Sequence, residues 1–216
     1  MKQVLFVCAS AMFLFSCSKK ETSVQGTNPS EPPAPTYSIS DYTKLTPGNY
    51  WIYQEVTIDT LNNITAIPGF DSCYIKGDTI INSNNYAIMV GLPPGAQNNE
   101  TYLRDSASFL VDNHGDILFT SADFNTILYK DSVPNQFTLT YSVSSTPSIV
   151  LTPMGTYNCY DNVGTFTYLQ PVPWPPVRYT HSYYAANLGL VDATTFSFYM
   201  NSPIIIKYWL VRARVN

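Results

Sequence analysis

The stretch that decides the fold class is Gln136–Ser144, which reads QFTLTYSVS. Its large residues Phe137, Leu139, Tyr141 and Val143 alternate with threonine or serine along the whole stretch. Successive side chains of a β-strand point to opposite faces, so this alternation predicts an antiparallel strand with one buried face.

Similar short segments recur from residue 37 to the end of the chain. Tyr50–Ile58 is a second clear strand, with apolar and aromatic residues on both faces. The other predicted strands are Phe70–Lys76, Tyr86–Gly91, Thr101–Asp105, Ser108–Asp112, Ile117–Thr120, Thr126–Lys130, Thr156–Asp161, Thr165–Gln170, Tyr179–Ala185, Thr194–Met200 and Ile204–Val215. Asparagine, glycine and proline stand between many of them, and these residues favour turns.

These segments predict an all-β domain, an antiparallel meander of about 10 to 13 strands. No window of a dozen residues shows the 3.6-residue apolar period of a helix. Two architectures remain open, a curved sheet that forms a half-barrel or barrel, and a two-sheet sandwich. The last strand is apolar on both faces, and both architectures accommodate such a strand.

The N-terminus has the composition of a secretory signal peptide. Lys2 precedes an apolar run from Val4 to Phe15, which is too short to span a bilayer. The following Leu14-Phe15-Ser16-Cys17 resembles the bacterial lipoprotein box, in which the cysteine carries diacylglycerol and becomes the first mature residue. We therefore predict a signal peptide over residues 1–16 and lipidation of Cys17. An ordinary signal peptide with an incidental cysteine is the alternative.

Residues 17–36 are predicted to form the lipidated N-terminus and a disordered tether, leaving a single β domain at 37–216. The tether is polar and rich in proline, so it buries too little apolar surface to fold. The lipid attaches the protein to a membrane. Ser18 follows the cysteine where lipoproteins retained in the inner membrane carry Asp, so the resemblance implies the outer membrane. The periplasmic face and the cell surface both stay open as locations.

Three landmarks in the domain resemble an uncharacterised family of Gram-negative outer-membrane lipoproteins. They are the Gly-Asn-Tyr-Trp opening within Leu45–Tyr53, the stretch Tyr102–Asp105, and Tyr184–Val191, which ends in Gly-Leu-Val. The resemblance implies a curved antiparallel sheet similar to the half-barrel of periplasmic lipoprotein carriers. It implies no catalytic residue.

Composition and motifs argue against enzymatic or nucleic-acid chemistry. The net charge is −4, with 11 basic and 15 acidic residues, which leaves no basic footprint for nucleic acid. A Gly-x-Ser-x-Gly nucleophile motif is missing, and the two histidines fit other roles. His181 fits a hydrogen-bonded sheet histidine, and His114 fits the turn Asp112–Asp116. We expect no enzyme, no metal and no cofactor.

Binding fits the composition better, because 14% of the residues are aromatic. The loop Gln170–Arg178 sets one tryptophan among four prolines, which stiffen the backbone around it. Its indole either contacts a ligand or closes the core. We predict an apolar hollow lined by Trp51, Trp174, Tyr183 and Trp209. The expected ligand is an apolar molecule, a glycan or an envelope protein. The alternative is a structural or accessory lipoprotein that acts through protein contacts alone.

Two modifications are predicted for the domain. Export delivers Cys73 and Cys159 to an oxidising compartment, so we expect a disulfide between them, with two separately buried thiols as the alternative. The pattern Asp-Ser/Thr-aliphatic resembles an O-glycosylation signal of some Gram-negative envelopes, although such pairs also favour turns. It occurs at Thr60, Thr79, Ser106 and Ser132.

Overall fold

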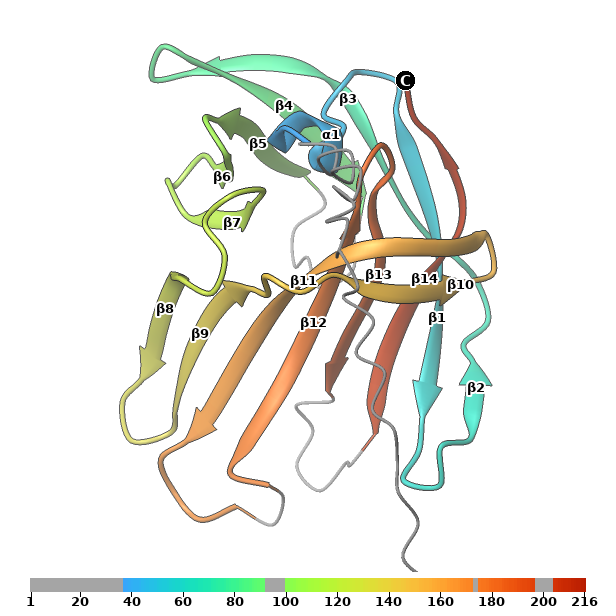
Figure 1. Ribbon diagram of the computed structural model, residues 1–216, viewed down its shortest axis with the longest axis vertical. Helices are drawn as coiled ribbons and strands as arrows, with labels where there is room; N and C mark the ends of the chain where they lie inside the picture. Colours follow the sequence, from blue (N-terminus) through green and yellow to red (C-terminus); the bar gives the residue numbers. More distant parts are fainter. Residues whose placement is uncertain (1–36, 92–99, 173–174, 197–203) are drawn as a thin grey trace, which may run out of the picture. The chain divides into compact units, whose positions relative to one another are not determined.

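The computed structural model describes residues 37–91, 100–172, 175–196 and 204–216 (Figure 1). The predicted signal peptide, Cys17 and the tether lie outside these residues. Trp174 also lies outside them.

The described strands form one antiparallel sheet of 14 strands. Its order is β7-β6-β5-β4-β3-β1-β14-β13-β12-β11-β9-β8, and β2 and β10 pair with β1 and β11 respectively. The first seven strands are β1 (Tyr50–Ile58), β2 (Ile64–Ala66), β3 (Asp71–Ile81), β4 (Asn84–Gly91), β5 (Glu100–Ser106), β6 (Phe109–Asp112) and β7 (Ile117–Thr120). The remaining seven are β8 (Ile127–Val133), β9 (Phe137–Val143), β10 (Ser148–Thr152), β11 (Gly155–Tyr168), β12 (Val177–Ala185), β13 (Gly189–Phe196) and β14 (Ile205–Arg214).

The sheet curls into a barrel-like form (Figure 1). Its two edge strands, β7 and β8, approach each other, but no strand pairing joins their described residues. We call this line of approach the seam. A side chain crosses it, because the Asn162 amide Nδ2 of β11 donates to the Leu118 carbonyl of β7 at 2.8 Å. The prediction of an all-β curved sheet is confirmed, and the described strands do not divide into a two-sheet sandwich.

One hairpin and one short helix pack against the curled sheet. The β10–β11 hairpin runs across the strands β13, β14 and β1 in Figure 1, and it contacts β13 and β14. The helix α1 (Ile39–Thr43) begins after Ser38, whose backbone amide donates to the Asp41 carboxylate at 2.8 Å. Three residues of α1 are buried, and two of them, Ile39 and Tyr42, pack against buried side chains of the strands.

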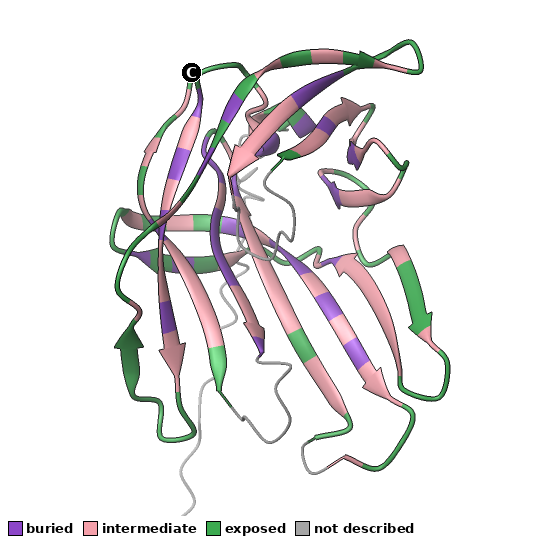
Figure 2. Ribbon diagram, turned by 180° about the vertical axis from the view of Figure 1, so that it is seen from behind, coloured by how far each residue is buried: buried purple, intermediate pink, exposed green. Residues whose placement is uncertain are grey.

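Two groups of buried side chains hold the sheet together. Figure 2 colours the buried residues purple along the strands. The first surrounds Trp51, Tyr53, Ile75, Val191 and Leu210. The second lies under α1, and its buried members are Ile39, Tyr42, Leu103, Leu110, Phe119 and Val143. Removing such apolar area from water is the main favourable contribution to folding.

The strand prediction differs from the structure at several places. Thr194–Met200 was predicted as a strand, but β13 begins at Gly189 and the predicted residues after Phe196 lie outside the described ones. Phe70–Lys76 was predicted as a strand, but β3 continues to Ile81. The helix α1 and the strands β2 and β10 were not predicted. Thr156–Asp161 and Thr165–Gln170 were predicted as two strands, but β11 runs through both as one strand of 14 residues. The intervening Asn162 and Gly164 resemble turn residues in sequence, yet both pair regularly with β9 and β12.

The predicted disulfide is wrong for this structure, because Cys73 and Cys159 are both free and buried. Each thiol packs into the first core group from its own strand. Cys73 of β3 lies opposite Trp51, whereas Cys159 of β11 lies opposite Ala185. Burial raises the pKa of both thiols to about 12, so both are neutral.

Candidate functional site

A cavity of about 620 Å³ lies against one end of β12, β13 and β14, and we call it the aromatic cavity. Its apolar lining includes Ile58, Tyr179, Tyr183, Phe196 and Ile205. Its basic lining residues are Arg178, His181 and Lys207. The volume lies within the range of roughly 300–1,000 Å³ that small-molecule sites occupy.

Strand register explains why these side chains meet, because directly opposite residues share one face of a sheet. One cross-strand row joins Asp161, Tyr183, Asp192 and Trp209. The neighbouring row on the same face joins His181, Thr194 and Lys207. Aromatic and charged residues from four strands, separated by up to 48 positions in the chain, therefore gather on one surface.

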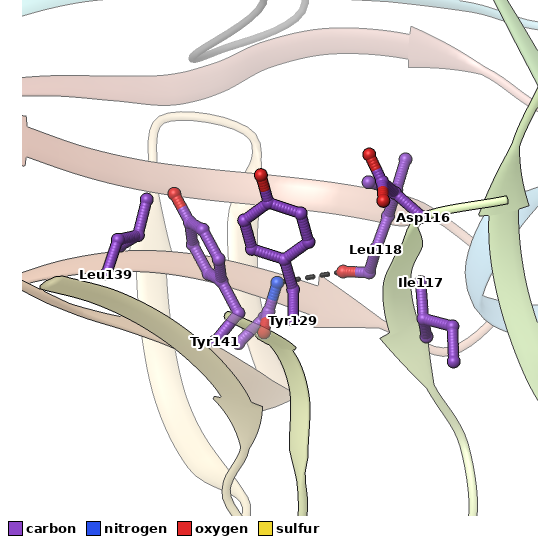
Figure 3. A pocket seen from close by; sticks show the side chains of 7 residues that line it. Asp116, Ile117, Leu118, Tyr129, Leu139 and Tyr141 are labelled. Carbon is purple, nitrogen blue, oxygen red and sulfur yellow. Dashed lines mark hydrogen bonds between the residues drawn. The ribbon is translucent and has the colours of Figure 1, made fainter. Parts of the chain in front are cut away.

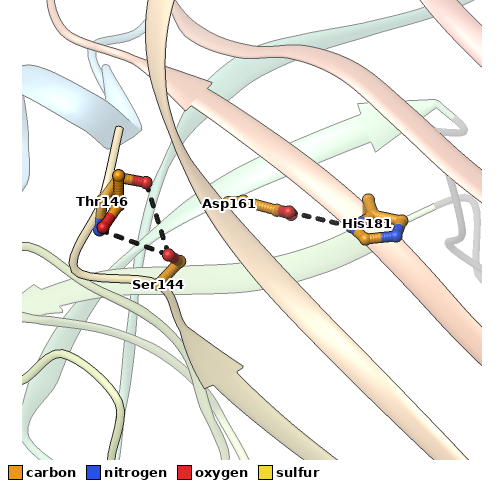
Figure 4. Close-up of polar contacts among 4 residues, drawn as sticks. All are labelled: Ser144, Thr146, Asp161 and His181. Atoms are coloured by element: carbon orange, nitrogen blue, oxygen red, sulfur yellow. Dashed lines mark hydrogen bonds and ion pairs between the residues drawn. The ribbon is translucent and has the colours of Figure 1, made fainter. Parts of the chain in front are cut away.

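A histidine–carboxylate contact and a lysine–carboxylate ion pair hold the polar side chains of these rows. The Asp161 Oδ2 atom lies 2.8 Å from His181 Nδ1, as Figure 4 shows, and Asp192 Oδ2 lies 2.9 Å from Lys207 Nζ. Both carboxylates are deeper than their partners, since Asp192 is 0% and Asp161 8% exposed. The basic groups are more accessible, with 32% of the His181 side chain and 23% of the Lys207 side chain exposed.

The buried carboxylates alter the electrostatics of the neighbouring groups. Burial raises the pKa of Asp192 above its usual value, although Lys207 opposes this shift. Burial, together with the charges of Asp161 and Asp192, raises the pKa of Tyr183 to about 12. The Tyr183 phenol is therefore neutral and can donate a hydrogen bond. Its ring stacks on that of His181, with 5.8 Å between the centroids.

Arg178 differs from the other two basic residues. No ion pair joins it to a carboxylate among the described residues, and its guanidinium lies over the Phe196 ring at 3.9 Å from the centroid. Neither Asp161 nor Asp192 lines the aromatic cavity. The cavity therefore combines apolar walls with basic groups, which is chemistry suited to an apolar molecule carrying an acidic group.

The residues predicted to line a hollow fall in different places. Tyr183 lines the aromatic cavity. Trp209 shares a cross-strand row with Tyr183, and Lys207 Nζ lies 5.9 Å from its ring centroid. Trp51 belongs to the core, where it is 2% exposed and its indole donates to the Leu188 carbonyl at 2.7 Å. Trp174 lies outside the described residues.

The basic lining residues and their carboxylates were not predicted as site residues. Arg178 stands in the sequence as the end of a proline-rich loop, and Lys207 as one polar residue in an apolar strand. The sequence signal for a site residue was the single charge of Lys207 within an otherwise apolar stretch of that strand. Only the register of β12, β13 and β14 shows that these charges are neighbours.

A second cavity, of about 350 Å³, lies at the seam, and we call it the seam cavity (Figure 3). Its lining comes from the β6–β7 turn, β7, β8, β9 and β11. The lining residues are Asp116, Ile117, Leu118, Tyr129, Leu139, Tyr141 and Asn162.

The predicted glycosylation positions are unequally accessible. Thr60 is exposed in the β1–β2 turn and Ser132 is exposed in β8, whereas Thr79 and Ser106 are half-buried in β3 and β5. The turn around His114 is held by Asp112, whose Oδ1 atom accepts from the backbone amides of His114 and Asp116 at 2.8 and 2.9 Å.

Two features are absent from the described residues, a cluster of metal ligands and a membrane-spanning helix. In that part of the chain, no three His, Cys, Asp or Glu side chains lie together so as to hold a metal ion. Within the same ranges, there is no helix of the length and apolarity needed to cross a membrane.

Comparison with known proteins shows likeness in fold. No protein-family model matches this chain, and no curated protein matches its sequence. The crystal structure of a "putative exported protein with YmcC-like fold" from Bacteroides fragilis aligns with a TM-score of 0.50 at 11% identity, covering 80% of this chain and 98% of that one. A "putative lipoprotein" from Parabacteroides distasonis aligns with a TM-score of 0.42 at 13% identity, covering 80% and 97%. The first of these likenesses shows that the barrel-like sheet of this chain recurs in a solved structure.

Proposed function

We propose that this protein is an exported, lipid-anchored binding module of the outer membrane, whose aromatic cavity holds an apolar molecule with an acidic group. The observation that carries the proposal is the cavity of about 620 Å³, which joins aromatic walls to basic side chains. The N-terminal signal and Cys17 support export and anchoring. The Bacteroides fragilis protein, which shares the fold, is also described as exported.

The apolar body of the ligand would lie against Tyr179, Tyr183 and Ile205. Tyr179 is 55% and Ile205 42% exposed, so a ligand that covers them removes apolar area from water. Each Å² of apolar area so removed contributes about 25 cal/mol. The apolar walls therefore provide affinity and little selectivity for one particular chain.

The acidic group would lie at Arg178. Lys207 already faces the Asp192 carboxylate at 2.9 Å, and His181 Nδ1 lies 2.8 Å from the Asp161 carboxylate, so both side chains already have a partner. Arg178 has no such partner among the described residues, and a guanidinium binds a carboxylate or phosphate in a bidentate manner. An acidic ligand would supply that missing partner.

The binding test compares decanoate with decanol, which share a chain and differ in the acidic group. The protein carries Cys17→Ser, so that no attached acyl chain competes for the cavity. We expect calorimetry to show tighter binding of decanoate. Arg178→Met should weaken decanoate binding about tenfold, the equivalent of one charge-assisted hydrogen bond, and leave decanol binding unchanged.

Arg214→Met is the matched control, because Arg214 is an exposed arginine of β14 that does not line the cavity. It should leave both ligands unaffected. Equal weakening of both ligands by Arg178→Met would refute the acidic-group assignment. Failure of both ligands to bind the protein would refute the proposed binding function.

A second candidate function, docking to an envelope protein, is favoured by β10. Ile149 and Leu151 of this strand are 74% and 72% exposed, and β10 pairs with β11 alone among the described strands. An unpaired edge with exposed apolar side chains is a template for another strand. If the protein cross-links to a specific envelope protein and Ile149→Lys abolishes this cross-link while decanoate binding stays intact, docking is favoured over ligand binding as the function.

A further inference from the structure

We propose that the seam cavity is a second binding site and that its ligand is a neutral saccharide ring. This inference stands on the seam cavity alone, so it does not depend on what the aromatic cavity binds. It follows from where the sheet fails to close and from the side chains that face that gap.

The cavity exists because the strands on either side of the seam do not pair. Backbone hydrogen bonds between β7 and β8 would draw the strands to about 4.8 Å and leave no room for a ligand. Instead, Asn162 of β11 donates from Nδ2 to the Leu118 carbonyl of β7 at 2.8 Å, the dashed line in Figure 3. This hydrogen bond joins β11 to β7, and a space of about 350 Å³ remains beside it.

The Asn162 carbonyl oxygen is an acceptor that lacks a donor. Asn162 is only 7% exposed, and among the described residues its Oδ1 atom receives no hydrogen bond. The bond from Nδ2 to Leu118 determines which amide atom is the oxygen. A buried acceptor without a partner costs about 1–3 kcal/mol, so a ligand that brings a hydroxyl to this atom gains that energy.

A second acceptor lies on the opposite side of the seam. The Asp116 side chain lines the cavity from the β6–β7 turn, and none of the described ion pairs involves its carboxylate. The cavity has no lysine, arginine or histidine in its described lining. The part of the lining that is described offers acceptors and no basic group, so it suits a ligand that supplies hydrogen-bond donors.

Two tyrosine rings provide flat apolar surfaces beside these acceptors. Tyr129 and Tyr141 are cross-strand partners of β8 and β9, and their ring centroids lie 6.1 Å apart with an interplanar angle of 54°. The Tyr141 ring lies against Gly164, the residue opposite it in β11. The absence of a side chain at Gly164 lets this ring lie close to the sheet.

A saccharide ring combines the properties that this lining requires. Its hydroxyl groups donate in several directions, and the C–H face of the ring packs on an aromatic surface. A quaternary ammonium ion would use the Asp116 charge but has no N–H group to donate to the Asn162 oxygen. The volume lies at the small end of the range for ligand sites, which limits the occupant to about one or two sugar rings.

The test measures sugar binding to the full-length protein in a non-glycosidic detergent by saturation-transfer NMR. The probes are glucose, galactose, mannose and N-acetylglucosamine, with tetramethylammonium as the cationic comparison. We expect at least one sugar to bind with a Kd on the order of 1 mM. Tyr129→Ala should weaken it about tenfold through loss of the ring contact, and Tyr129→Phe should retain it.

Tyr179→Ala is the matched control, because this exposed tyrosine lines the aromatic cavity and not the seam cavity. It should leave sugar binding unchanged. The proposal is overturned if no sugar in the set binds, if Tyr129→Ala and Tyr179→Ala have the same effect, or if tetramethylammonium alone binds. Failure of decanoate binding in the earlier test would leave this result unaffected, so the two proposals fail separately.

Discussion

On the β12–β14 face, the buried carboxylate of Asp192 is compensated by one partner, Lys207. Replacing a residue of such a pair therefore affects stability as well as ligand binding. Asp192 is 0% exposed and relies on Lys207 at 2.9 Å. Removing one partner of a buried pair leaves an uncompensated charge and typically costs about 3–5 kcal/mol. Arg178 has no carboxylate partner among the described residues, so its replacement removes a charge without exposing another. It is therefore the informative substitution for ligand binding.

The two domain cysteines provide a prediction at the residue scale. We expect Cys73 and Cys159 to be unreactive towards iodoacetamide at pH 8 in the native protein, because burial raises the pKa of each to about 12 and only the thiolate reacts. In denaturant without a reductant, both should be labelled. Peptide mapping by mass spectrometry separates them from Cys8 and Cys17. Labelling that requires a reductant would establish a disulfide.

Among the strands, β11 connects the two candidate sites. Its Asp161 side chain holds His181 on the face of the aromatic cavity, and the next residue, Asn162, lines the seam cavity on the other face. Successive residues of a strand point to opposite faces, so two neighbouring positions serve two sites. The strand pairs with β10 near its start, with β9 near its end and with β12 over most of its length.

Gly164 in β11 provides a prediction at the element scale. A Cβ atom at this position would contact the Thr180 hydroxyl and lie 2.6 Å from Tyr141 Cε1. Gly164→Ala should therefore lower the free energy of unfolding by about 1–3 kcal/mol, the usual cost of overpacking. Urea denaturation measures this change.

Gly77→Ala in β3 is the control for this substitution. A Cβ atom there would meet nothing within 4 Å, and the residue has no positive φ. We expect its stability to stay within about 1 kcal/mol of the unsubstituted protein. Equal destabilisation by the two alanines would show that the contact with Tyr141 is not responsible.

For the whole sheet, the central element is β14, the last strand in the chain. It lies between β1 and β13, and Tyr50 pairs with Arg214. The first and last strands of the domain are thus direct neighbours. The sheet cannot be completed until the C-terminal residues arrive, and such non-local pairing is associated with slow folding.

This central position predicts unequal effects of the same truncation. Leu210 of β14 is 0% exposed, so Leu210→Ala should cost about 2–5 kcal/mol. Ile127 of the edge strand β8 is 59% exposed, and Ile127→Ala should change stability by about 0.5 kcal/mol or less. The midpoints and slopes of urea unfolding compare the two. A similar cost at both positions would contradict the central role of β14.

The sequence by itself determined the class of the fold and several of its strands. Tyr50–Ile58 and Ile117–Thr120 coincide with β1 and β7, and Gln136–Ser144 exceeds β9 by one residue at each end. These predictions succeed because the alternation of apolar and polar residues is a local property that can be recognised from successive residues alone. Alternation also placed Tyr183 in a predicted strand, whereas its assignment to a hollow rested on the aromatic content of the chain.

Only the tertiary structure decided which strands are neighbours and which side chains meet. The register of β12 to β14 brings Arg178, His181 and Lys207 together, and the seam brings Asn162 to Leu118. It also decided that Trp51 is core and that the two cysteines stay free. The physical reason is that alternation along a strand shows which face of the sheet a side chain lies on. It does not show which residue of another strand lies opposite. Partners follow from pairing between strands as far apart as β1 and β14, which depends on the packing of the whole sheet.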